Sequence, residues 1–345
     1  MMREMRDAAA AAAAERLGAC YGGGTCDWPR FYTPRMERAN FASRYHLVYP
    51  GLGYFIQIRR DPTRAARLRP QLDNMYRGLL EPRCWRYWHD ELGEAGWPLQ
   101  ERNLTYAGRL ATFIGFYIDA FGAPPAPRIE LDGRSTTYRD LSHSLWQQMR
   151  ASPNCGVSCY NHESMVMCNA HMLINNRLHD RLYGTGYAAA NDAWLATVDT
   201  NLTVGGETGP LFFFGTQPND TAPIPKNRAL GADIWSLFLM SAVVPDRVRT
   251  WFAAWRDNII EDGETAHVAV ADWERDAEFS SDELASAWAF CLAQELGDTE
   301  LAQRLARYLA PCVHAGSERD PYIAGLYLLG HHLQPGAFGR LVTGG

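Results

Sequence analysis

One segment, Asn154–Gly184, constrains the fold of this chain more than any other: NCGVSCYNHESMVMCNAHMLINNRLHDRLYG. Its three- and four-residue spacing of apolar side chains predicts a helix that begins near Asn161, whose amide can cap the first turn, and ends at Gly184. Met165 and Cys168 share one apolar face, and the neighbouring face is apolar as well. A helix that is apolar on most sides must be buried on most sides, so we expect it inside a helical domain.

Cys159 and Cys168 are the two side chains of this segment that most suggest a site. They are nine residues apart, so on one continuous helix they would point to opposite sides. They can meet only if Cys159 belongs to the loop before the helix, and the cap at Asn161 predicts such a break. We therefore expect a two-thiol site rather than a disulfide.

Helical periodicity recurs along the whole chain, with very little strand. About twelve segments without an obvious linker predict an all-α fold, an α/α6 toroid of six helical hairpins. We expect a single domain over residues 1–345, with residues 1–20 as a peripheral N-terminal helix. An open α-solenoid is the alternative, but it should show repeated consensus positions, and none are visible. The predicted helices span residues 2–18, 37–58, 63–91, 101–121, 137–150, 161–182, 187–202, 227–242, 245–260, 281–296, 298–310 and 320–333.

The region from 204 to 226 interrupts the helical pattern. It contains Gly-Gly, Gly-Pro and Leu-Phe-Phe-Phe-Gly, and two prolines follow. We expect a long ordered loop or a short hairpin there. Long loops in compact domains are often functional.

Charge and hydropathy argue against two classes of partner. The net charge is −6 and there is no basic stripe, which argues against nucleic-acid binding. The run of alanines at residues 8–14 is short and flanked by charges of both signs, so we expect a helix at the solvent edge rather than an export signal or a membrane span. Eight cysteines without regular spacing favour a reducing compartment, and we expect a cytoplasmic protein.

Two other interpretations of the cysteines remain open. Cys155, Cys159, His162 and Cys168 could in principle bind zinc, but their spacing is not that of a knuckle or ribbon, so we expect no metal. Cys168 and His171 are neighbours on the helix and could form a nucleophile pair. A buried cysteine beside a hydrogen-bonded core histidine explains them equally well.

The chain is rich in aromatic residues, with 11 Trp, 16 Tyr and 14 Phe. A cavity with aromatic walls suits either sugar rings or a carbocation. The carboxylates that could serve a glycosidase, such as Glu163 and Asp233, have no spacing that singles out a pair.

Two runs resemble the linalool dehydratase/isomerase family: NLTYAGR at residues 103–109 and GVSCYNHESMVMCNAH at residues 156–171. The resemblance extends from about Asp27 to Tyr183 and is weaker beyond. Its most specific part is the pair of cysteines nine residues apart. The resemblance implies a metal-free α/α6 toroid without a cofactor, often a cyclic oligomer with its pocket near a subunit interface, that dehydrates and isomerises small terpenoid alcohols.

The resemblance also implies roles for individual residues. The acid–base groups of the family are two cysteines, an aspartate near the N-terminus with a tyrosine close by, and a histidine in a Met-Tyr-Ser-Gly-His type motif. The cysteines match Cys159 and Cys168, the aspartate matches Asp27, and the tyrosine matches Tyr32.

Two positions depart from that motif. Arg109 stands where the family has its histidine, and Thr105 stands where a methionine opens the motif. Arginine stays charged at any working pH and cannot shuttle a proton. We therefore expect Arg109 to bind an anion or a carbonyl oxygen, which points to a substrate bearing such a group or to a cyclisation.

We expect a cofactor-free lyase or isomerase, assembled as a homo-oligomer, that acts on a small terpenoid or similar apolar substrate. One of Cys159 and Cys168 would protonate a leaving hydroxyl or a double bond, and the other thiol or Asp27 would take a proton away. The alternatives are a carbohydrate-active toroid (a hydrolase or epimerase) and a non-catalytic binding relative. The residues expected to contact the substrate are Tyr32, Tyr45, Thr105, Tyr106, Phe113, His162 and Trp235.

Overall fold

The computed structural model describes residues 2–28, 44–90, 93, 95–100, 102–159, 163–206, 209–212, 215–216, 229–276, 280–314 and 321–345. These residues are mostly helical with a few short strands, so the prediction of an all-α fold is confirmed. The α-helices are α1 (Met2–Tyr21), α4 (Tyr45–Arg60), α5 (Ala65–Leu79), α6 (Pro82–Trp85), α7 (Tyr87–Asp90), α8 (Leu104–Phe121), α9 (Tyr138–Ala151), α10 (Val166–Tyr183), α11 (Asn191–Asn201), α12 (Leu230–Ser241), α13 (Pro245–Trp255), α14 (Asp272–Asp276), α15 (Asp282–Leu296), α16 (Thr299–His314), α17 (Pro321–His332) and α18 (Ala337–Thr343).

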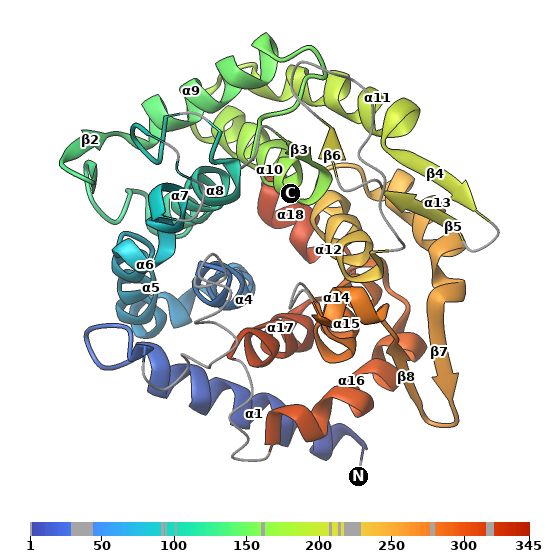
Figure 1. Cartoon of the computed structure of the whole chain (residues 1–345). Helices are drawn as coiled ribbons and strands as arrows, with labels where there is room; N and C mark the ends of the chain where they lie inside the picture. The colour runs from blue at the N-terminus through green and yellow to red at the C-terminus, as the bar shows by residue number, and fades with distance from the viewer. Residues whose placement is uncertain are drawn as a thin grey trace.

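Six of these helices, which we call the inner helices, contact one another in a closed series (Figure 1). α4 packs against α8, α8 against α10, α10 against α12, α12 against α15, α15 against α17, and α17 against α4. The sequence explains their position, because α8, α12 and α17 are buried over nearly their whole length. Helices α1, α5, α9, α11, α13 and α16 lie outside, each against an inner helix.

The two ends of the chain pack on this arrangement in different ways. Helix α1 lies along α16 and α17 and buries Ala9, Ala13 and Leu17, which share one face at four-residue spacing. Helix α18, which the sequence did not predict, contacts α4 and α10 and lies near the centre of Figure 1. It brings Phe338 into a stacked contact with Phe238 of α12, with ring centroids 4.9 Å apart.

The described strands form four antiparallel pairs. β1 (Ile129–Leu131) pairs with β2 (Arg134–Thr136), β3 (Ser164–Met165) with β6 (Gly215–Thr216), β4 (Thr203–Gly206) with β5 (Gly209–Phe212), and β7 (Ile259–Asp262) with β8 (Thr265–Val268). The β4–β5 pair is a short hairpin in the region where one was predicted; residues 217–226 of that region lie outside the described part of the chain.

Helix α10 begins later than the sequence predicted. It starts at Val166 with Met165 as N-cap, not near Asn161, which lies outside the described residues. The physical reason is the pairing of Ser164 with Thr216, which holds the chain extended up to Met165. The predicted end is confirmed, because Gly184 follows the helix with a φ of 68°, in the left-handed region.

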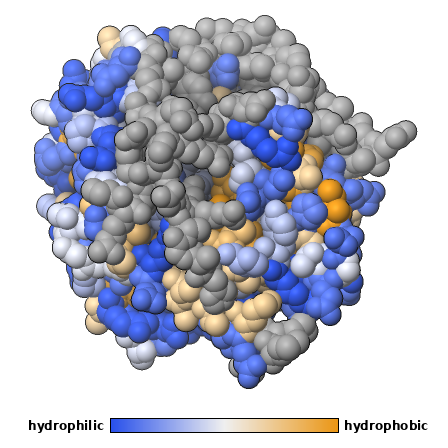
Figure 2. All heavy atoms as spheres, turned by 60° about the horizontal axis from the view of Figure 1, so that its bottom comes forward, coloured by the Kyte–Doolittle hydropathy of each residue, from blue (hydrophilic) through white to orange (hydrophobic). Residues whose placement is uncertain are grey.

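The surface carries few large apolar side chains. Among the described residues, Met5 and Ile260 are the exposed ones. Figure 2 shows one face of the molecule, where the described surface is mostly hydrophilic and apolar residues gather in a limited area. No helix within the described ranges is long and apolar enough to cross a membrane.

Glycines set the close approach of α4 and α17. A Cβ added at Gly325 of α17 would lie 2.4 Å from Cγ and 3.1 Å from Cα of Pro50 in α4. One turn further, Gly53 faces the backbone of Leu329, with a Cβ position 3.4 Å from its nitrogen. The contact between these two inner helices therefore depends on the missing side chain at Gly325.

Gly325→Ala should lower the free energy of unfolding by about 1–3 kcal/mol, because the added methyl group must push α17 away from α4. Gly18→Ala is the matched control: it also lies within a helix, but its Cβ position has no atom within 4 Å. That change should be neutral or stabilise by up to ~1 kcal/mol. Denaturant unfolding measures both, and wild-type stability of Gly325→Ala would contradict the tight packing.

Candidate active site

Cys159 and Cys168 lie together even though they are nine residues apart. Cys159 ends the described loop before α10, and its N–H donates to the carbonyl oxygen of Glu163 (2.6 Å), so the chain turns back on itself. Cys168 lies in the first turn of α10. Both side chains are buried, both cysteines are free, and their thiols lie close enough for each to shift the pKa of the other. The two-thiol arrangement expected from the sequence is thus assembled without a disulfide.

The side chain of Asn169 holds the loop that carries Cys159. Its Oδ1 accepts from the N–H of Val157 (2.7 Å), and its Nδ2 donates to the carbonyl oxygens of Val157 (3.1 Å) and Met165 (3.0 Å). Gly156 lets the same loop pack closely against α11, because a Cβ at this position would lie only 2.4 Å from the ring of Trp194. A buried amide and a glycine therefore fix the loop relative to the helix that carries Cys168.

Arg109 lies beside the thiol pair. It is fully buried on α8, and its Nη1 donates to Sγ of Cys168 (3.7 Å) and to the carbonyl oxygen (2.7 Å) and Oγ1 (3.2 Å) of Thr105. The guanidinium carbon lies 4.6 Å from the ring centroid of Tyr45 and 5.1 Å from that of Trp235. The structure thus brings together Arg109, Thr105, Tyr45, Trp235 and the cysteines, all of which the sequence had suggested.

The two thiols differ strongly in acidity. Burial, followed by the hydrogen bond with Cys168, raises the pKa of Cys159 well above its usual value. Burial would raise the pKa of Cys168 as well, but the hydrogen bond with Cys159 and the charge of Arg109 outweigh it and lower that pKa well below the usual range. These shifts favour the thiolate form of Cys168 and the thiol form of Cys159.

A second buried guanidinium, that of Arg44, shares the same acceptors. Its Nε donates to the carbonyl oxygen of Thr105 (2.9 Å) and its Nη2 to Oγ1 of Thr105 (3.1 Å). Its guanidinium carbon lies 4.7 Å from the ring centroid of Tyr45 and 4.6 Å from that of Tyr87. The sequence did not single out Arg44, because an arginine just before an apolar helix is usually a solvated one.

His171 and Tyr49 form a buried pair next to the site. The Tyr49 hydroxyl lies 3.0 Å from Nε2 of His171, and Nδ1 lies 3.3 Å from Oγ1 of Thr112. Because the Thr112 hydroxyl donates to the carbonyl oxygen of Gly108 (2.8 Å), we assign the His171 proton to Nδ1 and the role of donor to Tyr49. With both ring nitrogens occupied, His171 is a hydrogen-bonded core histidine and not the partner of a Cys168 nucleophile.

The surroundings of His171 also favour its uncharged form. Burial, with the charge of Arg109 as a second cause, lowers its pKa well below the usual value. Tyr49, its partner, was not among the predicted site residues, although it lies one helical turn after Tyr45 in α4. That four-residue spacing is the signal that could have identified it.

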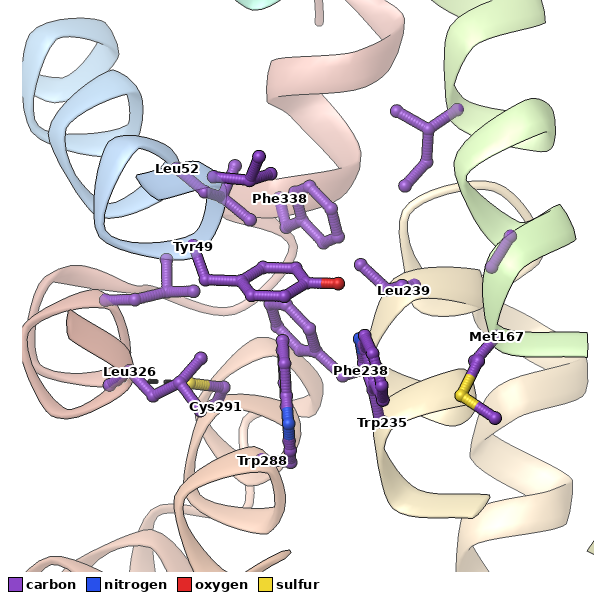
Figure 3. Packing of buried hydrophobic residues seen from close by; sticks show 14 of the residues in the cluster. Tyr49, Leu52, Met167, Trp235, Phe238, Leu239, Trp288, Cys291, Leu326 and Phe338 are labelled. Atoms are coloured by element: carbon purple, nitrogen blue, oxygen red, sulfur yellow. Dashed lines mark hydrogen bonds between the residues drawn. The ribbon is translucent and has the colours of Figure 1, made fainter. Parts of the chain in front are cut away.

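Aromatic rings from three inner helices lie around Tyr49, and Figure 3 shows two of them, Trp235 of α12 and Trp288 of α15. Its ring meets that of Trp288 edge-on with centroids 4.8 Å apart, and Trp288 stacks on Trp235 at 5.6 Å. Tyr322 of α17 stacks on the other side of Tyr49 at 5.4 Å. These rings pack into one aromatic cluster, and Trp235 joins it to Arg109; the cavity with aromatic walls stays a prediction.

The other predicted residues have different surroundings. Phe113 lines a cavity of about 10 Å³, room for about one water, that Tyr49 and His171 also line and that lies between α4, α8, α10, α12 and α18. The Tyr106 hydroxyl donates to the carbonyl oxygen of Leu79 (2.7 Å) and so points toward α5. Asp27 is half-buried after α1, where its N–H donates to the carbonyl oxygen of Cys20 (2.9 Å). Tyr32 and His162 lie outside the described residues.

Comparison with known families decides the relationship. The family model for linalool dehydratase/isomerase matches residues 45–322. The chain belongs to the linalool dehydratase/isomerase family. The match continues well beyond Tyr183, where the resemblance in the sequence had weakened, and it begins after Asp27 and Tyr32, so those two assignments lie outside it. Linalool dehydratase/isomerase is a family of lyases and isomerases, and the chain has that type of function at the level of the family.

The presence of a metal site can be judged only for the described residues. Within the described ranges, no three His, Cys, Asp or Glu side chains converge as a metal site. One member of the sequence-derived zinc set, His162, lies outside those ranges. The metal-free site implied by the resemblance therefore stays a prediction.

The ultraviolet absorbance of the Cys168 thiolate, taken as wild type minus Cys168→Ser, should titrate well below the value of about 8.5 of a free cysteine. In Arg109→Met the midpoint should rise, because the positive charge that favours the thiolate is gone. Arg247→Met, which removes an exposed ion pair with Asp199 (2.8 Å), should leave it unchanged. An unaltered midpoint in Arg109→Met would show that Arg109 does not control this thiol.

Proposed function

We propose that the chain is a lyase or isomerase that needs no cofactor and acts on a small isoprenoid or similarly apolar substrate by acid–base chemistry between two thiols. The observation that carries the proposal is the buried, hydrogen-bonded pair of Cys159 and Cys168 with pKa values moved in opposite directions. A pair of groups whose environments separate their pKa values is the usual arrangement of an acid and a base in one site.

The acidities suggest which thiol has which role. Cys159, the thiol, would donate its proton to a leaving hydroxyl or to a double bond. Cys168, the thiolate, would accept a proton from a neighbouring carbon, so that a dehydration releases water and leaves a new double bond. Because the two thiols lie close enough to shift each other's pKa, the proton on Cys168 would then return to Cys159 over a short path. Each transfer of this kind typically accelerates a reaction by roughly 10²–10⁴-fold.

The aromatic wall supports the same chemistry. Loss of a hydroxyl from an apolar carbon skeleton develops positive charge, which ring faces stabilise through their quadrupoles. Tyr49 offers such a ring close enough to Cys168 for that thiol to act on its pKa, and Trp288 and Tyr322 pack against Tyr49. Tyr45 and Trp235 already face the guanidinium of Arg109, so we assign them to holding Arg109 in place.

The arrangement of helices is part of the proposal. We infer that the inner and outer helices form an α/α6 toroid and a single domain, with the site at the centre of the inner helices. The closed series of contacts from α4 through α17 supports this. Homo-oligomeric assembly and a cytoplasmic location stay predictions from the sequence.

The non-catalytic alternative rested on Arg109 in place of a proton carrier. The contact of Arg109 with Cys168 (3.7 Å) favours catalysis instead, because it moves the basic role to the thiolate. A charged residue that tunes a neighbouring base does not itself need to exchange a proton.

Cys159→Ser and Cys168→Ser should each lower turnover by roughly 10²-fold or more. The reason is that a serine hydroxyl ionises and donates its proton less readily than a cysteine thiol. Cys291→Ser is the matched control, since Cys291 is buried on α15 and donates to the carbonyl oxygen of Leu326 (3.3 Å), a bond that serine can keep. Mass spectrometry of products from a panel of isoprenoid alcohols measures all three. Full turnover in either site variant would exclude the mechanism.

A further inference from the structure

One edge of the Arg109 guanidinium has no partner among the described residues. Its Nε and Nη2 are buried and make no hydrogen bond, and the side chain is 0% exposed. Buried N–H groups are nearly always paired, and a charged group left unpaired is the most costly kind. An edge of this kind calls for an acceptor that is not part of the described protein.

The other sides of the guanidinium are already occupied. Nη1 donates to Thr105 and Cys168, and the rings of Tyr45 and Trp235 lie against the group. The Tyr49 hydroxyl is hydrogen-bonded to His171 (3.0 Å) and also lies close enough to Arg109 for the charge of Arg109 and a hydrogen bond with it to act on the pKa of Tyr49. Nε and Nη2 are nevertheless left without a partner among the described residues, so this edge is where Arg109 can still bind a ligand.

That edge has a definite chemistry. The Nε–H and one Nη2–H of a guanidinium point in the same direction and match the two oxygens of a carboxylate or phosphate in a bidentate contact. A single neutral hydroxyl or carbonyl oxygen can accept from both N–H groups only through bent hydrogen bonds, and it brings no negative charge to offset that of the guanidinium. The geometry fits an oxyanion better than any neutral oxygen.

We propose that the substrate carries an oxyanion, a carboxylate or a phosphate, attached to its apolar skeleton, and that this group binds across Nε and Nη2 of Arg109. The inference rests on the proposed function, because it names the substrate on which Cys159 and Cys168 act. It also removes a difficulty of that function, because the positive charge of the Arg109 guanidinium would repel a carbocation that develops a few ångströms away. A bound oxyanion offsets the charge of Arg109, while Cys168 keeps the proton-accepting role.

Isothermal titration of the full chain with three matched probes tests the proposal: geraniol, geranic acid and geranyl monophosphate, which share an isoprenoid skeleton. At least one oxyanion probe should bind about 10-fold or more tightly than the alcohol, as expected for charge-assisted bidentate hydrogen bonds. The probe with the higher affinity identifies the headgroup as carboxylate or phosphate. Equal or weaker affinity of both oxyanion probes, or their failure to bind, overturns the proposal.

Variants localise the headgroup. Arg109→Lys keeps the positive charge but loses the two parallel N–H groups, so it should reduce the preference for the oxyanion. Arg247→Lys, which changes an exposed ion pair, should leave that preference unchanged. Cys168→Ser removes the neighbouring thiolate and should tighten oxyanion binding, because a like charge is lost. If Arg109→Lys kept the wild-type preference for the oxyanion over the alcohol, the oxyanion would bind elsewhere and the assignment would be overturned.

These titrations are independent of the chemistry. If the oxyanion probes bind as expected but Cys159→Ser retains turnover, the thiol mechanism fails and the substrate class stands. If the serine variants are inactive but the alcohol binds best, the mechanism stands and the oxyanion does not. The wild-type comparison needs no variant, so it remains decisive even if Arg109→Lys does not fold.

Discussion

The site depends on one buried contact, in which the guanidinium of Arg109 donates to the sulfur of Cys168 (3.7 Å) and favours the charged form of that thiol. Charges of this kind are stable in a protein interior only when they are paired and hydrogen-bonded, and removal of one partner typically costs about 3–5 kcal/mol. Here the pairing is completed by Thr105, whose carbonyl and hydroxyl oxygens both accept from Arg109. In the mechanism we propose, this contact makes Cys168 the base and leaves Cys159 as the acid.

The helices hold this pair in a fixed position. α8 carries Arg109 and Thr105 one turn apart, and α10, which packs against α8, carries Cys168 and the Asn169 amide that holds the preceding loop. Because the loop is held by a side chain from the first turn of α10, the two thiols move with one helix. The aromatic rings come from α4, α12, α15 and α17, so every inner helix contributes to the surroundings of the site.

Much of the fold could be predicted from the sequence, because apolar spacing and helix stops are local signals. Gly184 as the end of α10 is an example, since only its own backbone conformation matters. The start of α10 could not be predicted, because the strand pair that delays it involves Thr216, which is distant in the chain. Helix α18 was missed for a similar reason: its burial depends on a contact with Phe238 rather than on a pattern of its own.

The candidate site was predicted in part. The cysteine pair followed from a loop–helix break, and Arg109 from its place in a motif. Arg44 and the Tyr49–His171 pair were missed, because the sequence does not reveal which polar side chains neighbouring helices enclose. Phe113 was suggested as a substrate contact by the local density of aromatic residues, and the structure places it against a cavity that holds about one water.

The pH dependence of kcat/KM tests the central claim most directly, because it reports the ionisation of the essential groups of the free enzyme. With Cys168 as thiolate and Cys159 as thiol, activity should already be at its plateau at neutral pH, with its acid limb well below the range of an ordinary cysteine and a decline only in strongly alkaline solution. A single rise centred near 8.5, the value of an unperturbed thiol, would mean that Arg109 and Cys168 do not form the ion pair on which this account depends.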